Sequence, residues 1–175
     1  DKMPTYPEWE RQVLEETYEN VDYISLHKYY GNNSQDTLNF FAKIEETGRY
    51  IQTVGSTIDY VKAKKGAKND VHICFDEWNV WYHIRDDDHR RIQEWDWPEA
   101  PALLEEAYNF EDALFVGGLL NEFIRCSDRV RIACIAQLVN VIAPIRADTG
   151  GPAWRQTIYY PYQFASLYGR GVALN

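Results

Sequence analysis

Residues 71–82 read VHICFDEWNVWY, and this stretch limits the possible folds more than any other part of the chain. From Val71 to Phe75, apolar residues alternate with a histidine and a cysteine, which predicts a short buried strand. The apolar run then ends at Asp76 and Glu77, and three aromatic residues follow within the next five positions. The sequence therefore predicts a carboxylate at the carboxyl end of a buried strand, surrounded by aromatic rings.

A carboxylate among aromatic rings suits a sugar as the ligand. Aromatic faces pack against the apolar faces of a pyranose or furanose ring, and a carboxylate can act on the anomeric carbon. The alternative is that Glu77 is an ordinary charged residue at a strand end, where it caps the following loop. The spacing alone leaves both interpretations open.

The composition favours a neutral, polyhydroxylated ligand over a charged polymer. The chain has a net charge of -9 without a basic patch, and it contains 13 Tyr and 6 Trp. This charge argues against nucleic acid and against an anionic membrane surface as partners. No apolar run approaches the ~20 residues that a membrane-spanning helix needs.

The compartment is predicted from the amino terminus and from the cysteines. No signal peptide is visible, so we expect a cytoplasmic protein or a segment from the interior of a longer one. Cys74, Cys126 and Cys134 are odd in number and lack a Cys-x-x-Cys spacing. We interpret them as buried free thiols in a reducing compartment.

Around the central strand, the chain alternates helices and strands. The strand expected at residues 130–141 is nearly all apolar, which suits a parallel strand covered on both faces. Gly48 could interrupt the longest predicted helix. The predicted helices span residues 7–20, 37–65 and 109–126, the other strands span residues 21–30 and 130–141, and a loop around Trp154, Tyr159 and Pro161 leads into a last helix at residues 164–167.

Polar residues gather where each predicted strand ends. In an α/β protein this arrangement is typical of a β/α barrel or a doubly wound sheet. A glycine-rich phosphate-binding motif is not found at any strand-to-helix turn, which counts against a nucleotide-binding sheet, and no cofactor is predicted.

Residues 82–101 are too charged to pack and too long for an ordinary connection. The segment from His83 to His89 carries possible metal ligands, but nothing fixes their geometry, so we interpret it as a solvated loop and predict no metal site. Trp95 and Trp97 either hold this loop against the rim of the fold or form an outer wall of the pocket. The sequence does not decide between these two roles.

Six segments strongly resemble α-L-arabinofuranosidases of glycoside hydrolase family 51, and together they cover nearly the whole chain. The segments are SLHKYYG (25–31), FDEWNVWY (75–82), NFEDAL (109–114), AQLVNVIAP (136–144), GPAWRQTIYYP (151–161) and YGRG (168–171). The resemblance implies an α/β fold that is part of a (β/α)8 TIM barrel. Residues 1–175 would supply the last three βα units, and the rest of the barrel and an attached β-sandwich would be absent from this chain. It also implies retaining hydrolysis of terminal arabinofuranosyl groups in oligosaccharides or polysaccharides, and a homo-oligomer for the full enzyme.

The resemblance further assigns roles to individual residues. Glu77 matches the catalytic nucleophile, and Tyr29 matches the tyrosine that orients it through a hydrogen bond. His27, Trp81 and Gln137 match substrate-binding positions. Elementary chemistry agrees for the first pair, because a retaining glycosidase needs an ionised carboxylate and a phenol hydrogen bond favours that form. We therefore expect Glu77 and Tyr29 within hydrogen-bonding reach at the carboxyl ends of adjacent strands.

One part of the family pattern is missing. The family's general acid/base is a glutamate that follows an asparagine at the end of the fourth barrel strand, which this chain does not contain. Asn121 and Glu122 have the same two residue types in the same order, but they fall inside a predicted helix. The two carboxyl groups of a retaining glycosidase stand ~5–5.5 Å apart across the sugar, so we reject Glu122 as the acid/base.

Three hypotheses follow for the function. The chain is part of an arabinofuranosidase, or a sugar-binding module without catalysis, or part of a related barrel hydrolase with another glycoside as substrate.

Three strands of a barrel would also leave open edges and an uncovered inward face. We expect Ile24, Ile73 and Ile132 to lie on this inward face.

Overall fold

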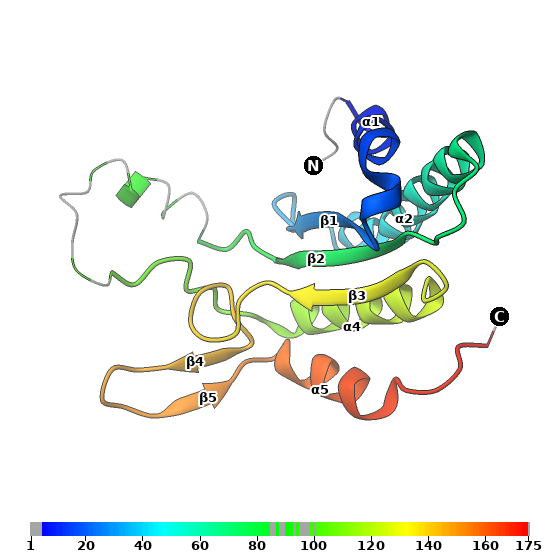
Figure 1. Cartoon of the computed structure of the whole chain (residues 1–175). Coiled ribbons are helices and arrows are strands. Elements are labelled where there is room, and N and C mark those ends of the chain that lie inside the picture. The colour runs from blue at the N-terminus through cyan, green and yellow to red at the C-terminus, as the bar shows by residue number, and fades with distance from the viewer. Residues whose placement is uncertain are drawn as a thin grey trace.

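The computed structural model describes residues 5–84, 87, 90–92, 94, 99 and 101–174. Three parallel strands form its centre in the order β1-β2-β3, and a short antiparallel pair, β4-β5, follows them. Figure 1 shows the three strands side by side with α2 and α4 on one face. The elements are α1 (Glu8–Thr17), η1 (Tyr18–Asn20), β1 (Tyr23–Tyr30), α2 (Thr37–Lys65), β2 (His72–Val80), α4 (Phe110–Arg125), β3 (Val130–Ile135), β4 (Ile145–Ala147), β5 (Ala153–Arg155) and α5 (Tyr159–Tyr168).

The predicted mixed α/β order with a parallel sheet is confirmed for β1, β2 and β3 and the helices between them, whereas the pair β4-β5 was not predicted, and Trp154, which was assigned to a loop, lies in β5. The longest helix, α2, begins where the Asp36 side chain accepts a hydrogen bond from the amide of Asn39, and it ends at Gly66, whose φ of 63° is left-handed. The helix is continuous, so the interruption expected at Gly48 is absent. Gly48 instead allows a close approach to α4, because a Cβ there would lie 1.7 Å from a carboxylate oxygen of Glu122.

The sheet has one covered face and one open face. Ile24 and Ile73 are 5% and 0% exposed and pack under the helices, so their assignment to the uncovered inward face was wrong. Ile132 is 38% exposed, and its register partner Cys74 lies on the open face with it. Strand β3 is therefore covered on one face only, in contrast to the prediction for residues 130–141.

Two strand boundaries differ from the sequence prediction. Strand β2 continues to Val80, so Asp76 and Glu77 lie within the strand and not after it. Strand β3 ends at Ile135, six residues before the predicted end at Val141. Left-handed backbone angles follow soon after Ile135, with φ of 65° at Gln137, and such angles cannot continue a strand.

The carboxyl-terminal helix is longer than predicted. Tyr159 and Pro161 were assigned to a loop, but both lie in the first turn of α5, where a proline is tolerated because its missing N–H would have no helical partner. None of the helices in the described part of the chain is both long and apolar enough to cross a membrane. All three cysteines are free, as predicted, but of the thiols expected to be buried only Cys126 is; Cys74 is half-buried and Cys134 is exposed.

The core between the sheet and the helices is aromatic. Phe40 of α2 and Phe115 of α4 stack with their ring centroids 4.1 Å apart and their planes at 10°, and both side chains are at most 1% exposed. Tyr30, at the end of β1, lies 5.1 Å from the Phe115 ring. This stack holds both helices against the strand ends that carry the polar residues.

The Phe115 stack gives a testable stability difference. We expect Phe115→Ala to lower the free energy of unfolding by about 3–5 kcal/mol, because it removes a fully buried ring and leaves a cavity. The control is the substitution of the neighbouring residue, Leu114→Ala. Because the Leu114 side chain is 51% exposed, this change should lower the free energy of unfolding by about 0.5 kcal/mol or less. Urea unfolding of both variants measures the difference, and equal losses would show that the stack is not part of the core.

Candidate active site

Glu77 and Tyr29 meet on the open face of the sheet. The Tyr29 hydroxyl donates a hydrogen bond of 2.5 Å to Oε1 of Glu77, so the predicted contact at adjacent strand ends is confirmed. The register of β1 and β2 shifts between Leu26 and His27, because Phe75 pairs with Leu26 while Glu77 pairs with His27.

This register shift is a β-bulge at Asp76, and it decides where Glu77 points. In a regular strand, Glu77 would lie on the same face as Phe75, which is fully buried under the helices. The extra residue turns Glu77 to the opposite face, beside His27 and Tyr29. Asp76 also remains on the open face, where it accepts a hydrogen bond of 2.7 Å from the Ser25 hydroxyl.

Tyr29 is well suited to donate a proton in this hydrogen bond. Its pKa is raised, first by partial burial of the phenol and then by the hydrogen bond to Glu77 and its charge. The hydroxyl therefore keeps its proton at neutral pH. The arrangement leaves the second oxygen of the Glu77 carboxylate available to a ligand on the open face.

Trp81 lies against the same pair. Its backbone N–H donates to the carbonyl of Tyr30 at 2.8 Å, which continues the pairing of the two strands beyond Val80. Its ring lies edge-on to the ring of Tyr29, with centroids 5.5 Å apart and planes at 75°. The structure therefore brings three of the five predicted site residues together.

For the other two predicted residues, His27 and Gln137, the described part of the chain shows no side-chain hydrogen bond to Glu77. His27 is exposed on the open face as the register partner of Glu77. Gln137 is exposed and follows Ala136, whose amide donates to the Trp78 carbonyl at 2.8 Å.

The rejected pair Asn121 and Glu122 lies inside α4, as predicted. Glu122 is 8% exposed and accepts hydrogen bonds from Arg125 one turn later. Its carboxylate therefore belongs to the helix interface and not to the open face of the sheet.

Sequence reasoning missed Asn79, which organises the end of β2. This amide is fully buried; its Nδ2 donates to the carbonyls of Ala136 and Ile142, and its Oδ1 accepts from the amide of Val80. It thereby ties the strand that carries Glu77 to the loop that carries Gln137. The signal was present as a polar residue between apolar neighbours at a strand end.

Two buried carboxylates were also missed, and they hold the segment after Trp81. Glu106 accepts from the amide of His83 at 2.9 Å, and Asp112 lies 2.9 Å from Nε2 of the same histidine. Both acids are 0% exposed. Burial raises the pKa of Glu106, and the hydrogen bond to Asp112 raises the pKa of His83.

Part of the loop that follows lies outside the described residues. This includes Trp95 and Trp97, whose two alternative roles stay open, and most of the possible metal ligands between His83 and His89. No group of three or more metal-ligating side chains occurs elsewhere in the residues that the structure describes.

The fold and site define a class of protein. Parallel strands bring a phenol-bonded carboxylate and an indole ring to one end of the sheet, an arrangement that suits a sugar as the ligand. Residues 76–175 match the family model of the alpha-L-arabinofuranosidase C-terminal domain, and the chain belongs to this family.

Relatives and solved structures agree with this assignment. The chain is 54% identical to the intracellular exo-alpha-(1->5)-L-arabinofuranosidase of Acetivibrio thermocellus, over 98% of this chain and 34% of that protein. It is 56% identical to the protein of the same description from Halalkalibacterium halodurans, over 99% and 34%. A family 51 alpha-L-arabinofuranosidase from Bifidobacterium longum superimposes with a TM-score of 0.90 at 38% identity, over 97% of this chain and 36% of that one. The chain thus spans about a third of the length of these proteins.

The pair formed by His83 and Asp112 should make stability depend on pH. Because the pKa of His83 is raised in the folded protein, the protonated ring stabilises the fold. This contribution to the free energy of unfolding is fully present below the ordinary histidine pKa of 6.5, and it is lost as the pH rises through the raised value. Glu106 and Glu111 add negative charge near the same ring, in the same direction.

We therefore expect the melting temperature of the protein to fall more steeply between about pH 6 and 9 than that of His83→Gln, which cannot titrate. Calorimetry of the two proteins across this range measures the difference. Parallel curves would show that the imidazolium does not stabilise the fold.

Proposed function

We propose that this chain carries the nucleophile half of the active site of a retaining α-L-arabinofuranosidase. The observation that carries the proposal is the hydrogen bond from Tyr29 to Glu77, on the face that the bulge at Asp76 exposes. The family match and the arabinofuranosidase names of the relatives support the substrate class.

In the proposed mechanism, the Glu77 carboxylate attacks the anomeric carbon while a second carboxyl group, in its protonated form, donates its proton to the departing oxygen. This forms a covalent glycosyl-enzyme, which water then hydrolyses with net retention of configuration. Tyr29 orients the nucleophile, and Trp81 offers an aromatic wall to the sugar ring. His27 and Gln137 are proposed as polar contacts to its hydroxyl groups.

We further propose that residues 1–175 are the carboxyl-terminal portion of a (β/α)8 catalytic domain and provide its last three βα units. The open face of the three-stranded sheet would then face the barrel interior, which explains why Ser25, His27 and Cys134 are exposed here. The natural substrates would be arabinofuranosyl-containing oligosaccharides or polysaccharides, and the full enzyme would be a homo-oligomer. The relatives named intracellular support a cytoplasmic location.

Replacing the nucleophile tests the mechanism. In the complete enzyme, Glu77→Ala should lower kcat on an aryl arabinofuranoside by a factor on the order of 10⁴ or more, because no neighbouring group can attack in its place. Added azide or formate should partly restore turnover with this activated substrate.

The matched control is Asp76→Ala, which removes the neighbouring carboxylate on the same face. It should retain far more activity than Glu77→Ala and should gain nothing from azide. If Glu77→Ala stays within about tenfold of the wild-type rate, the nucleophile is another acid. An inactive wild-type enzyme that still binds arabinose oligosaccharides would favour the sugar-binding module, and activity on another glycoside alone would favour the related hydrolase.

The isolated 175 residues should not hydrolyse the same substrate. A nucleophile without a proton donor loses a factor on the order of 10²–10⁴ from general acid catalysis. The open edges and the uncovered sheet face should also make the fragment associate. Sedimentation and activity assays measure both properties, and a monodisperse monomer with turnover like that of the relatives would contradict both expectations.

A further inference from the structure

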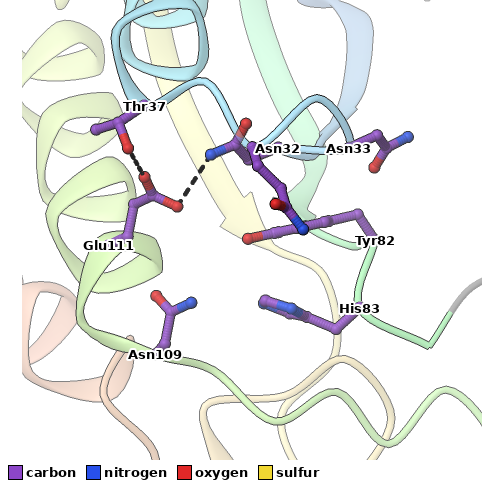
Figure 2. Close-up of a pocket in the computed structure, with 8 residues that line it drawn as sticks. Asn32, Asn33, Thr37, Tyr82, His83, Asn109 and Glu111 are labelled. Carbon is purple, nitrogen blue, oxygen red and sulfur yellow. Dashed lines mark hydrogen bonds between the residues drawn. The ribbon is translucent and has the colours of Figure 1, made fainter.

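A second polar pocket lies beyond the carboxyl ends of β1 and β2. It has a volume of about 580 Å³, within the usual range for small-ligand sites. Figure 2 shows its three walls: the loop after β1 with Asn32 and Asn33, the segment after β2 with Tyr82 and His83, and the start of α4 with Glu111. None of its lining residues belongs to the pair formed by Glu77 and Tyr29.

The lining chemistry points to a neutral ligand with many hydroxyl groups. Asn33, Gln35 and Asn109 contribute amides, which can both donate and accept. The Tyr82 and His83 rings, with centroids 3.9 Å apart, form an aromatic wall. Among the residues that the structure describes, neither Lys nor Arg lines the pocket, which favours a neutral ligand over a phosphate.

The carboxylate of Glu111 is already oriented by the protein. It accepts a hydrogen bond from Asn32 at 3.1 Å and another from the hydroxyl of Thr37, and these bonds lower its pKa, with the bond from Thr37 having the larger effect. Figure 2 shows the two bonds joining Glu111, at the start of α4, to Asn32 in the loop after β1 and to Thr37 at the start of α2. An ionised carboxylate that is fixed in this way can accept hydrogen bonds from sugar hydroxyls.

The opposite wall is fixed as well. His83 is held by Asp112 through its ring and by Glu106 through its backbone amide. The Tyr82 ring packs 6.1 Å from the core ring of Phe40. Because hydrogen bonds and packing within the protein already fix Glu111, Tyr82 and His83, binding would cost little reorganisation of these side chains.

We propose that this pocket is a second saccharide-binding site, which takes a sugar unit of the polymer that the Glu77 site cleaves. The identity of the sugar rests on the proposed function, whereas the pocket itself does not. Trp81 lies against the ring of Tyr29, the hydrogen-bond partner of Glu77, and Tyr82 lines the second pocket, so one short segment contributes to both sites. A polymer chain bound at the rim would cross this segment.

Binding of an α-1,5-linked arabinotriose to the complete enzyme, and to its Glu77→Gln variant in which the sugar should not be hydrolysed, tests the proposal. In NMR titrations, the side-chain amide signals of Asn33, Gln35 and Asn109 should shift with the trisaccharide concentration. The double variant Asn33→Ala/Gln35→Gly should bind at this site about tenfold more weakly, because two hydrogen-bonding amides are lost. Glycine is chosen at position 35 because the φ of Gln35 is 54°.

The control is Gln12→Ala, an exposed glutamine on α1 away from the pocket, which should leave binding unchanged. A second variant, Glu77→Gln, should leave the shifts of the three pocket amides in place. If the pocket amides do not shift, or if the double variant binds as the wild type does, the second site is refuted and the proposed function is unaffected. Shifts that persist while Glu77→Ala retains turnover in the complete enzyme would support the second site and overturn the nucleophile assignment instead.

Discussion

The β-bulge at Asp76 is the constraint on which the candidate site depends. Side chains alternate between the two faces of a strand, so one additional residue moves every later side chain to the opposite face. Without it, the strand that places Phe75 under the helices would direct Glu77 into the same apolar core, where a carboxylate would lack compensating partners. With it, Glu77 reaches the open face and the hydroxyl of Tyr29. The bulge therefore allows one strand to supply both a core ring and a candidate nucleophile.

Buried polar side chains set the loops around this site. Asn79 joins the end of β2 to the loop after β3, and Glu106 and Asp112 hold the segment that follows Trp81. Each of these three side chains is 0% exposed and fully engaged in hydrogen bonds, which a buried polar group requires to offset its loss of water. Their directional bonds fix the loop geometry more narrowly than apolar packing would, and they lie directly beneath the residues that would meet a sugar.

The uncovered face of the sheet agrees with the partial length of the chain. The two relatives from Acetivibrio thermocellus and Halalkalibacterium halodurans are about three times as long, because this chain spans 34% of each. A sheet with helices on one side and exposed polar side chains on the other, such as those of Ser25 and His27, is incomplete as a core but suited to line a cavity. The same architecture explains why the nucleophile candidate is exposed in the isolated chain, whereas Glu106 and Asp112 are buried.

The sequence by itself determined the order of the three parallel strands and the helices between them, since apolar periodicity, the Asp36 cap and the Gly66 stop act within a few residues, whereas the pair β4-β5 was found only in the structure. It also determined the pairing of Glu77 with Tyr29, because the FDEW and HKY segments carry a recognisable family pattern. Features that depend on neighbouring strands were decided only by the tertiary structure. The apolar residues after Ile135 did not indicate the left-handed backbone angles that end the strand there. The FDEW segment likewise did not indicate the bulge that turns Glu77 to the open face. Which face of β3 is covered, and which acids are buried, likewise depended on helices distant in the chain, because burial is a property of packed elements and not of local spacing.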